Sequence, residues 1–146
     1  MEKTNLFRLI HATEIISNEN IVKFSSKFAF PVGISAILVL AQLRANGPVM
    51  QSDLAETLGY TKGAITNISS KLVKFELAER LYSEEDRRTI HLQITEKGRS
   101  ALMEAQKIGE EIFVELFEEL TVEELDQYLY IQQKILNSMK NKRLSS

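Results

Sequence analysis

The hydrophobic pattern of this chain changes its period once, near the middle of an otherwise helical sequence. Ile90, Leu92 and Ile94 alternate with polar residues, which is typical of a half-buried strand. The extended run at residues 80–83 is suited to pair with this strand, and the charged residues 84–87 would form the turn between them. We therefore expect a mainly α protein that carries one small two-stranded β-hairpin.

Four helices are predicted before the hairpin, from apolar residues at helical spacing. The first is long and covers residues 6–28. The second starts near Ser35 and is apolar on almost every side, so it is expected to be fully buried. A short helix follows at residues 51–59, and Thr61 is the predicted N-cap of a fourth helix that reaches about Phe75.

Two long helices are predicted after the hairpin. Thr95 caps a helix that runs through Leu116, and the sequence from Thr121 to Glu124 is a capping box that opens the last helix. A frayed polar tail is expected at the end of the chain. The pattern predicts an N-terminal helix with its linker, a central module, and C-terminal helices with the polar tail (141–146), at residues 1–34, 35–99 and 100–146.

The fourth helix has two unlike faces. Ile65, Ile68 and Leu72 lie together on a helical wheel, and the opposite side carries small or polar residues, namely Gly63, Thr66, Asn67, Ser70 and Lys74. The order of a short helix, a polar-faced helix and a β-hairpin is that of a winged helix-turn-helix. In that fold the second helix enters the DNA major groove, where outward side chains read the base edges.

Charge and composition exclude several other classes of function. The 146 residues carry 18 Lys and Arg against 20 Asp and Glu, so any anion-binding surface must be local. Residues 60–99 are mildly basic and residues 100–140 are acidic. The chain has no cysteine, which excludes thiol catalysis and thiol redox sensing, and its only histidines, His11 and His91, form no metal-ligand set. We expect neither an enzyme nor a cofactor.

The location predicted from the sequence is the cytoplasm. The longest apolar stretch, residues 28–43, is interrupted by proline, glycine and serine and is shorter than the roughly 18 to 20 residues that span a bilayer. The first residues lack the basic and apolar regions of a signal peptide.

Two stretches of the sequence indicate a family. Residues 47–59 read Gly-Pro-Val-Met-Gln-Ser-Asp-Leu-Ala-Glu-Thr-Leu-Gly, and residues 86–98 read Asp-Arg-Arg-Thr-Ile-x-Leu-x-Ile-Thr-x-Lys-Gly. They resemble the first motif helix and the wing of the MarR (multiple antibiotic resistance regulator) transcription factors. The resemblance covers nearly the whole chain. It implies a ligand-responsive repressor that binds a palindromic operator as a homodimer, joined through its N- and C-terminal helices.

The resemblance also implies how the wing contacts DNA, and the chemistry of the remaining side chains indicates the other contacts. Arg88 would enter the minor groove from the wing, held by Asp86, with Arg87 beside it. Asn67 is the best candidate for direct readout, because its amide can bond both N6 and N7 of adenine. The other predicted contacts are to bases for Thr66 and Ser70, and to phosphates or the nearby backbone for Gln51, Ser52, Thr61, Lys62, Gly63, Lys71 and Lys74.

Two features depart from the family pattern. Thr66, Asn67 and Ser70 are neutral, where the outward residues of the recognition helix in relatives often include a basic side chain, so the base preference is not transferable. Glu76 stands before Leu77, where the family usually has a glycine after this helix, so the helix exit is expected to differ.

Small effectors, often aromatic or phenolic, are also implied by the resemblance. An aromatic set, Phe24, Phe28, Phe30, Phe113 and Phe117, is a candidate lining for an effector cleft, and core packing is the other interpretation. Two further classes remain open. A winged-helix module that binds protein predicts that the wing arginines are dispensable, and a small-molecule carrier or enzyme predicts ligand binding that is insensitive to changes in helix 61–74.

Overall fold

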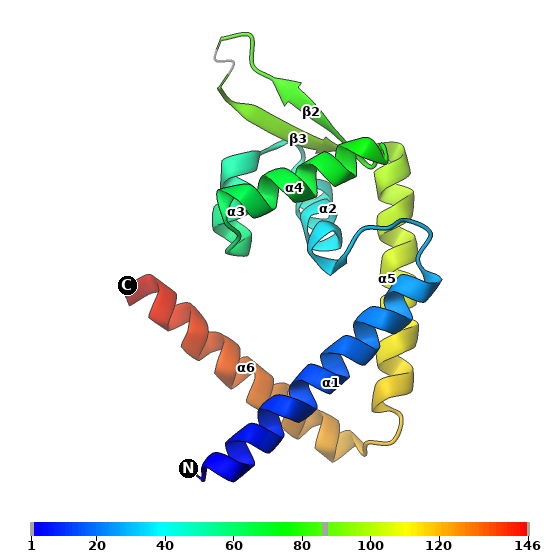
Figure 1. The fold of residues 1–146 in the computed structure, drawn as a ribbon, viewed down its shortest axis with the longest axis vertical. Helices are drawn as coiled ribbons and strands as arrows, with labels where there is room; N and C mark the ends of the chain where they lie inside the picture. The colour runs from blue at the N-terminus through cyan, green and yellow to red at the C-terminus, as the bar shows by residue number, and fades with distance from the viewer. Residues whose placement is uncertain (1, 86–87, 146) are drawn as a thin grey trace. The chain divides into compact units, whose positions relative to one another are not determined.

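The structure, a computed structural model, describes residues 2–85 and 88–145. Over these residues the chain forms six helices and three strands (Figure 1). They are α1 (Lys3–Lys27), α2 (Ile34–Asn46), β1 (Val49–Met50), α3 (Gln51–Leu58), α4 (Lys62–Lys74), β2 (Ala78–Tyr82), β3 (Ile90–Ile94), α5 (Glu96–Phe117) and α6 (Val122–Ser145). The chain divides into two compact units, Met1–Glu110 and Glu111–Ser146. The three domains predicted from the sequence stay a prediction.

The first unit contains the winged helix-turn-helix that the sequence predicts. Its helices α2, α3 and α4 pack around one core, and β2 and β3 project from them as a hairpin (Figure 1). Leu40, Leu54, Leu72 and Leu92 come from four different elements, and none is more than 1% exposed. Burial of these leucines fixes α3 and α4 against the sheet.

The sheet has three strands instead of the predicted two. β1 pairs antiparallel with β3, with Val49 opposite Leu92 and Met50 opposite His91, so the order is β1-β3-β2. A strand of two residues is too short to produce a detectable alternation, and for this reason the sequence pattern missed it. The β2 strand also begins earlier than predicted, at Ala78.

Helix α2 is not buried on every side, which corrects the prediction. Val39, Leu40 and Leu43 are fully buried, whereas Ile34 is 47% exposed and Leu38 is 46% exposed. An all-round apolar sequence does not by itself provide neighbours on every face. Among the described residues of this unit, no neighbouring element covers the side of α2 that carries Ile34 and Leu38.

All three predicted threonine caps are confirmed. Thr61 Oγ1 accepts a hydrogen bond from Ala64 N at 3.1 Å, and Thr95 Oγ1 accepts one from Gly98 N at 2.9 Å. In the second unit, Thr121 N donates to the Glu124 carboxylate at 3.0 Å, while Glu124 N donates to Thr121 Oγ1 at 3.1 Å. Each cap satisfies backbone donors that a helix start leaves without partners.

The predicted polar tail is helical, so that prediction is wrong. α6 continues to Ser145, whose hydroxyl donates to the carbonyl oxygens of Asn141 and Lys142. The segment contains no glycine or proline to stop the helix, and Lys142 and Arg143 lie where the helix dipole favours positive charge.

Within the described residues, no helix has the combined length and apolar character that crossing a membrane requires.

Candidate nucleic-acid interface

Helix α4 presents its predicted polar face to solvent. Ile65 is 1% exposed and Leu72 is fully buried, which fixes the inward side of the helix. Ile68 is only half-buried, and Ser69 is fully buried, with its hydroxyl donating to Ile65 O at 2.7 Å. The predicted site residues of this helix are all exposed, namely Lys62, Gly63, Thr66, Asn67, Ser70, Lys71 and Lys74.

The Thr66 hydroxyl already has two partners. It donates to Lys62 O at 2.8 Å and accepts from Gln51 Nε2 at 3.2 Å, so the first residue of α3 is tied to the exposed face of α4. Gln51 Oε1 is buried and has no partner among the described residues. Thr66 therefore has no hydrogen left to donate and offers a methyl group and a lone pair to a ligand.

Asn67 has its whole amide available. Its side chain is exposed and makes no hydrogen bond or ion pair within the part of the chain that the structure describes. Both the N–H₂ donor and the carbonyl acceptor are therefore available, as bidentate recognition of a base requires.

Arg80 adds a cation to this face, which the sequence pattern did not predict. Its Nη2 donates to Ser70 Oγ at 2.9 Å, which joins β2 to α4. Residues two apart on a strand share a face, and Ala78, which is 2% exposed, packs inward. The alternation from Ala78 to Arg80 was the signal that could have placed this arginine against α4.

A hollow lies between the starts of α3 and α4 and the beginning of β3. Its volume is about 420 Å³, and its lining includes Gln51 and Ser52 from α3, Lys62 from α4, and Arg88 before β3. Two cationic side chains and the first turn of a helix thus border one concave surface. The two cations favour an anionic group here, beside an apolar lining that includes Met50, Ile65 and Ile90.

The wing is described only in part. Arg88 is exposed, whereas Asp86 and Arg87 lie outside the described residues. The predicted pairing of Arg88 with Asp86, and the predicted contact through Arg87, therefore stay predictions. Thr61, the cap of α4, is exposed as well, and Lys74 Nζ lies 5.6 Å from the centre of the Phe75 ring.

Helix α4 ends in a backbone geometry that glycine usually adopts, but the residue at that position is Glu76. Glu76 has φ of 61°, the left-handed region that favours glycine. Leu77 N donates to Leu72 O at 2.8 Å, and Glu76 N donates to Val73 O at 3.0 Å, the two bonds of a Schellman motif. Glu76 thus adopts a backbone conformation that favours glycine. The expectation that this helix exit differs from that of the family stays a prediction.

Large apolar faces stay exposed in both units. On α1 they include Phe7 and Leu9, 66% and 65% exposed, and on α6 they include Leu129 and Leu136, 54% and 61% exposed.

The five predicted cleft phenylalanines form two groups. Phe28 contacts both Phe24 and Phe30 in the first unit, and Phe113 and Phe117 stack in the second. The effector cleft stays a prediction.

Comparison with known proteins gives one consistent family. A sequence model of the MarR family matches residues 34–90. The transcriptional repressor MprA of Escherichia coli is 32% identical over 102 residues, which cover 70% of this chain and 58% of MprA. The chain thus spans less than two thirds of that relative. The multiple antibiotic resistance protein MarR of Escherichia coli is 27% identical over 134 residues, 90% of each chain.

Solved structures share the fold. A MarR mutant from E. coli, crystallised in complex with operator DNA, has a TM-score of 0.74 and 23% sequence identity, and the match covers 90% of this chain and 94% of that chain. Figure 1 shows the order of elements in this chain, with α3 and α4 followed by the β2–β3 hairpin.

Proposed function

The chain belongs to the MarR family, and from this premise we propose that it is a sequence-specific DNA-binding regulator of transcription. One observation carries the proposal. The exposed face of α4 is small and polar, and Arg80 and Arg88 supply positive charge at its borders. A surface of this kind fits the base edges of a major groove between two negatively charged backbones.

In this proposal α4 is the recognition helix. Asn67 accepts from N6 and donates to N7 of an adenine, since its amide is available for both bonds. Thr66 contacts a thymine methyl group through its own methyl, because its hydroxyl hydrogen is bonded to Lys62 O. Ser70 keeps a hydroxyl hydrogen to donate, and Arg80 adds a cation beside it from β2.

The remaining predicted residues hold the phosphates and the minor groove. Arg88 enters the minor groove, held by Asp86 and assisted by Arg87. The absence of a side chain on Gly63, which has no neighbouring atom within 4 Å of a Cβ position, lets a backbone approach the helix. The phosphate contacts are assigned to Gln51, Ser52, Thr61, Lys62, Lys71 and Lys74.

The regulator works as a homodimer joined through α1 and α6. Both helices expose apolar side chains such as Phe7 and Leu136, more than a lone protein ordinarily leaves in water. Two-fold symmetry places two recognition helices on two half-sites, so the operator is an imperfect palindrome.

The mode of regulation is repression that a ligand relieves, in the cytoplasm. MprA, a relative of this chain, is a transcriptional repressor. A small aromatic or phenolic effector that prefers one arrangement of the dimer would shift the two recognition helices out of register with the grooves.

Fluorescence-anisotropy titration tests this function. A duplex from the region upstream of the chain's own gene is compared with a scrambled duplex of equal length at one fixed salt concentration. We expect a preference of about 10³-fold, at the lower end of the range for specific binders. R80Q and R88Q should weaken binding, while K134Q, which removes the same charge from an exposed position on α6, should not.

The outcomes separate the candidate functions. Equal binding of both duplexes with a steep dependence on salt would indicate a non-specific DNA-binding protein. Equal, weak binding that ignores salt and is insensitive to R80Q and R88Q would instead indicate a winged-helix module that binds protein, and would contradict the proposal.

A further inference from the structure

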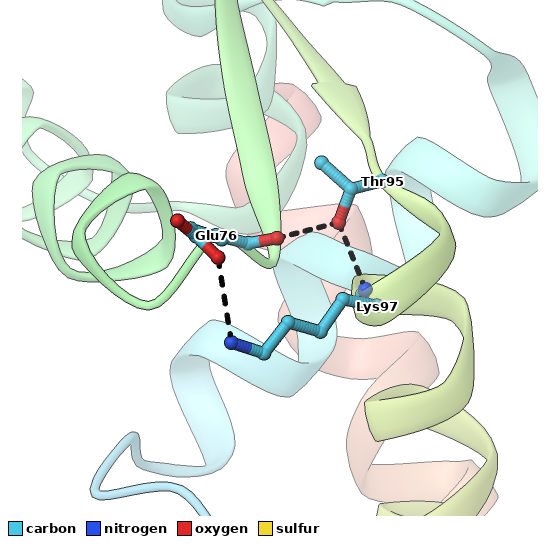
Figure 2. A network of polar contacts seen from close by, with 4 residues as sticks. Glu76, Thr95 and Lys97 are labelled. Atoms are coloured by element: carbon cyan, nitrogen blue, oxygen red, sulfur yellow. Dashed lines mark hydrogen bonds and ion pairs between the residues drawn. The ribbon is translucent and has the colours of Figure 1, made fainter.

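Glu76 lies in the left-handed conformation at the exit of α4, and its side chain has a partner there. Its carboxylate Oε2 lies 3.6 Å from Lys97 Nζ, in the first turn of α5 (Figure 2). Thr95 Oγ1 donates to Glu76 O at 2.6 Å and also caps α5. Glycine would adopt this backbone without strain, but it would provide no group for Lys97 to bind.

Lys97 has a second contact, which leads toward α1. Its Nζ lies 5.5 Å from the centre of the Phe30 ring, in the linker between α1 and α2. Phe30 packs edge-on against Phe28, with 5.7 Å between ring centres, and Phe28 contacts Phe24 at 5.1 Å. Lys97 therefore joins three segments of the first unit, namely the exit of α4, the start of α5 and the aromatic linker that follows α1.

We propose that Glu76 and Lys97 form a clasp that positions the recognition helix for DNA binding. We define the α4 clasp as Glu76, Lys97 and Phe30. None of the three needs to touch DNA. The clasp holds the exit of α4 at an angle set by α5 and by the end of α1, so a change in α1 is transmitted to α4. The inference rests on the proposed function, because its readout is DNA affinity.

The direction in which DNA affinity changes when the Glu76 charge is removed tests this inference. Glu76 is exposed, and removal of an acidic group from a DNA-binding protein ordinarily strengthens binding, because it removes repulsion from phosphates. The clasp predicts the opposite result, since loss of the carboxylate releases Lys97 and loosens the exit of α4. Glu79 provides a matched control, because it is an exposed glutamate on β2 with no ion pair among the described residues.

The experiment is a double-mutant cycle on the full-length chain. Operator affinity is measured by anisotropy at one salt concentration for the wild type, E76Q, K97M, the double variant E76Q/K97M, and E79Q. We expect E76Q and K97M each to weaken binding by about two- to fivefold, the double variant to be no weaker than K97M alone, and E79Q to bind as tightly as the wild type or more so.

Two results would overturn the clasp. One is an E76Q variant that binds DNA as tightly as E79Q does, and the other is a double variant in which the two losses multiply. If the wild type binds no duplex, the proposed function fails, and amide hydrogen exchange decides the clasp without DNA. The clasp predicts faster exchange at Glu76 N and Leu77 N in both E76Q and K97M, and unchanged rates in both variants would contradict it.

Discussion

Thr66 and Asn67 are neighbours on the exposed side of α4, yet they differ in what they offer to a base. The Thr66 hydroxyl is engaged by Lys62 O and Gln51, whereas the Asn67 amide has no partner among the described residues. The Thr66 hydroxyl has no hydrogen left to donate to a base, whereas the Asn67 amide can both donate and accept. Direct readout is therefore expected to depend on Asn67 more than on Thr66.

N67A should reduce the preference for the operator over a scrambled duplex by about 1–3 kcal/mol, with little change in binding to the scrambled duplex. The reason is that Asn67 contacts a base and not a phosphate. Anisotropy titrations of both duplexes measure the ratio. Equal weakening on both duplexes would show that Asn67 contributes no sequence information.

E76G should raise the free energy of unfolding by about 0.5–1 kcal/mol, because glycine adopts positive φ without the strain that a Cβ causes. The gain is partly offset by the greater freedom of glycine in the unfolded chain and by loss of the contact with Lys97. Urea unfolding followed by circular dichroism checks this. E76Q keeps the Cβ and is the control that should show no gain.

The sequence identified most side chains on the exposed side of α4, because helical periodicity determines which positions share a face. It did not identify Arg80, since that residue reaches α4 from another element and contact between elements has no local signal. It also could not show that the Thr66 hydroxyl is occupied, because Gln51 lies fifteen positions earlier in the chain.

The junction between α4 and α5 depends on one glycine. A Cβ on Gly98 would collide with the carbonyl oxygen of Leu77 and would lie 2.9 Å from Ile94 Cγ1. Gly98 N also donates to Thr95, so the start of α5 cannot move away without losing its cap. Backbone at this contact has little freedom to relax, which makes an added methyl group costly.

G98A should lower the free energy of unfolding by about 2–3 kcal/mol, the range for overpacking against a fixed backbone. The matched control is G109A in the same helix, where an added Cβ has no atom within 4 Å. That change should stabilise the protein by up to about 1 kcal/mol, since alanine is the better helix former. Thermal unfolding measures the Tm of both variants. A shift of the two Tm values in the same direction would contradict the packing argument.

Among the elements, those with strong local signals were predicted correctly. Thr61, Thr95 and the Thr121–Glu124 box mark helix starts because their side chains bond the adjacent backbone. β1 was missed because its two residues pair with a strand distant in sequence. The helical end of α6 and the exposed side of α2 were also mispredicted, because composition does not show which neighbours are present.

The whole molecule exposes more apolar surface than a monomer readily tolerates. On α6, Leu129, Leu136 and Met139 are each more than half exposed and lie along one side at helical spacing. On α1, Leu6 and Ile10 lie four positions apart, on the same side of the helix, and are also exposed. These side chains make little contact with their own unit, and the proposed dimer would bury them against a second copy.

L136D should convert the dimer to a monomer without unfolding it, because Leu136 is 61% exposed and a charge on that stripe cannot be buried in an interface. The monomer should bind the operator at least about 10²-fold more weakly, since two half-sites are no longer held by one molecule. Sedimentation equilibrium measures the mass. K134D, a change at an exposed position on the other side of α6, should remain dimeric, and a dimeric L136D would place the interface elsewhere.

The central claim is that a two-fold dimer reads DNA sequence through α4 and the wing. Selection of bound duplexes from a randomised pool, followed by sequencing, tests it without knowledge of the natural operator. We expect enrichment of inverted repeats whose half-site centres lie about one helical turn, roughly 10 base pairs, apart. Retained duplexes that are no more alike than the starting pool would contradict it.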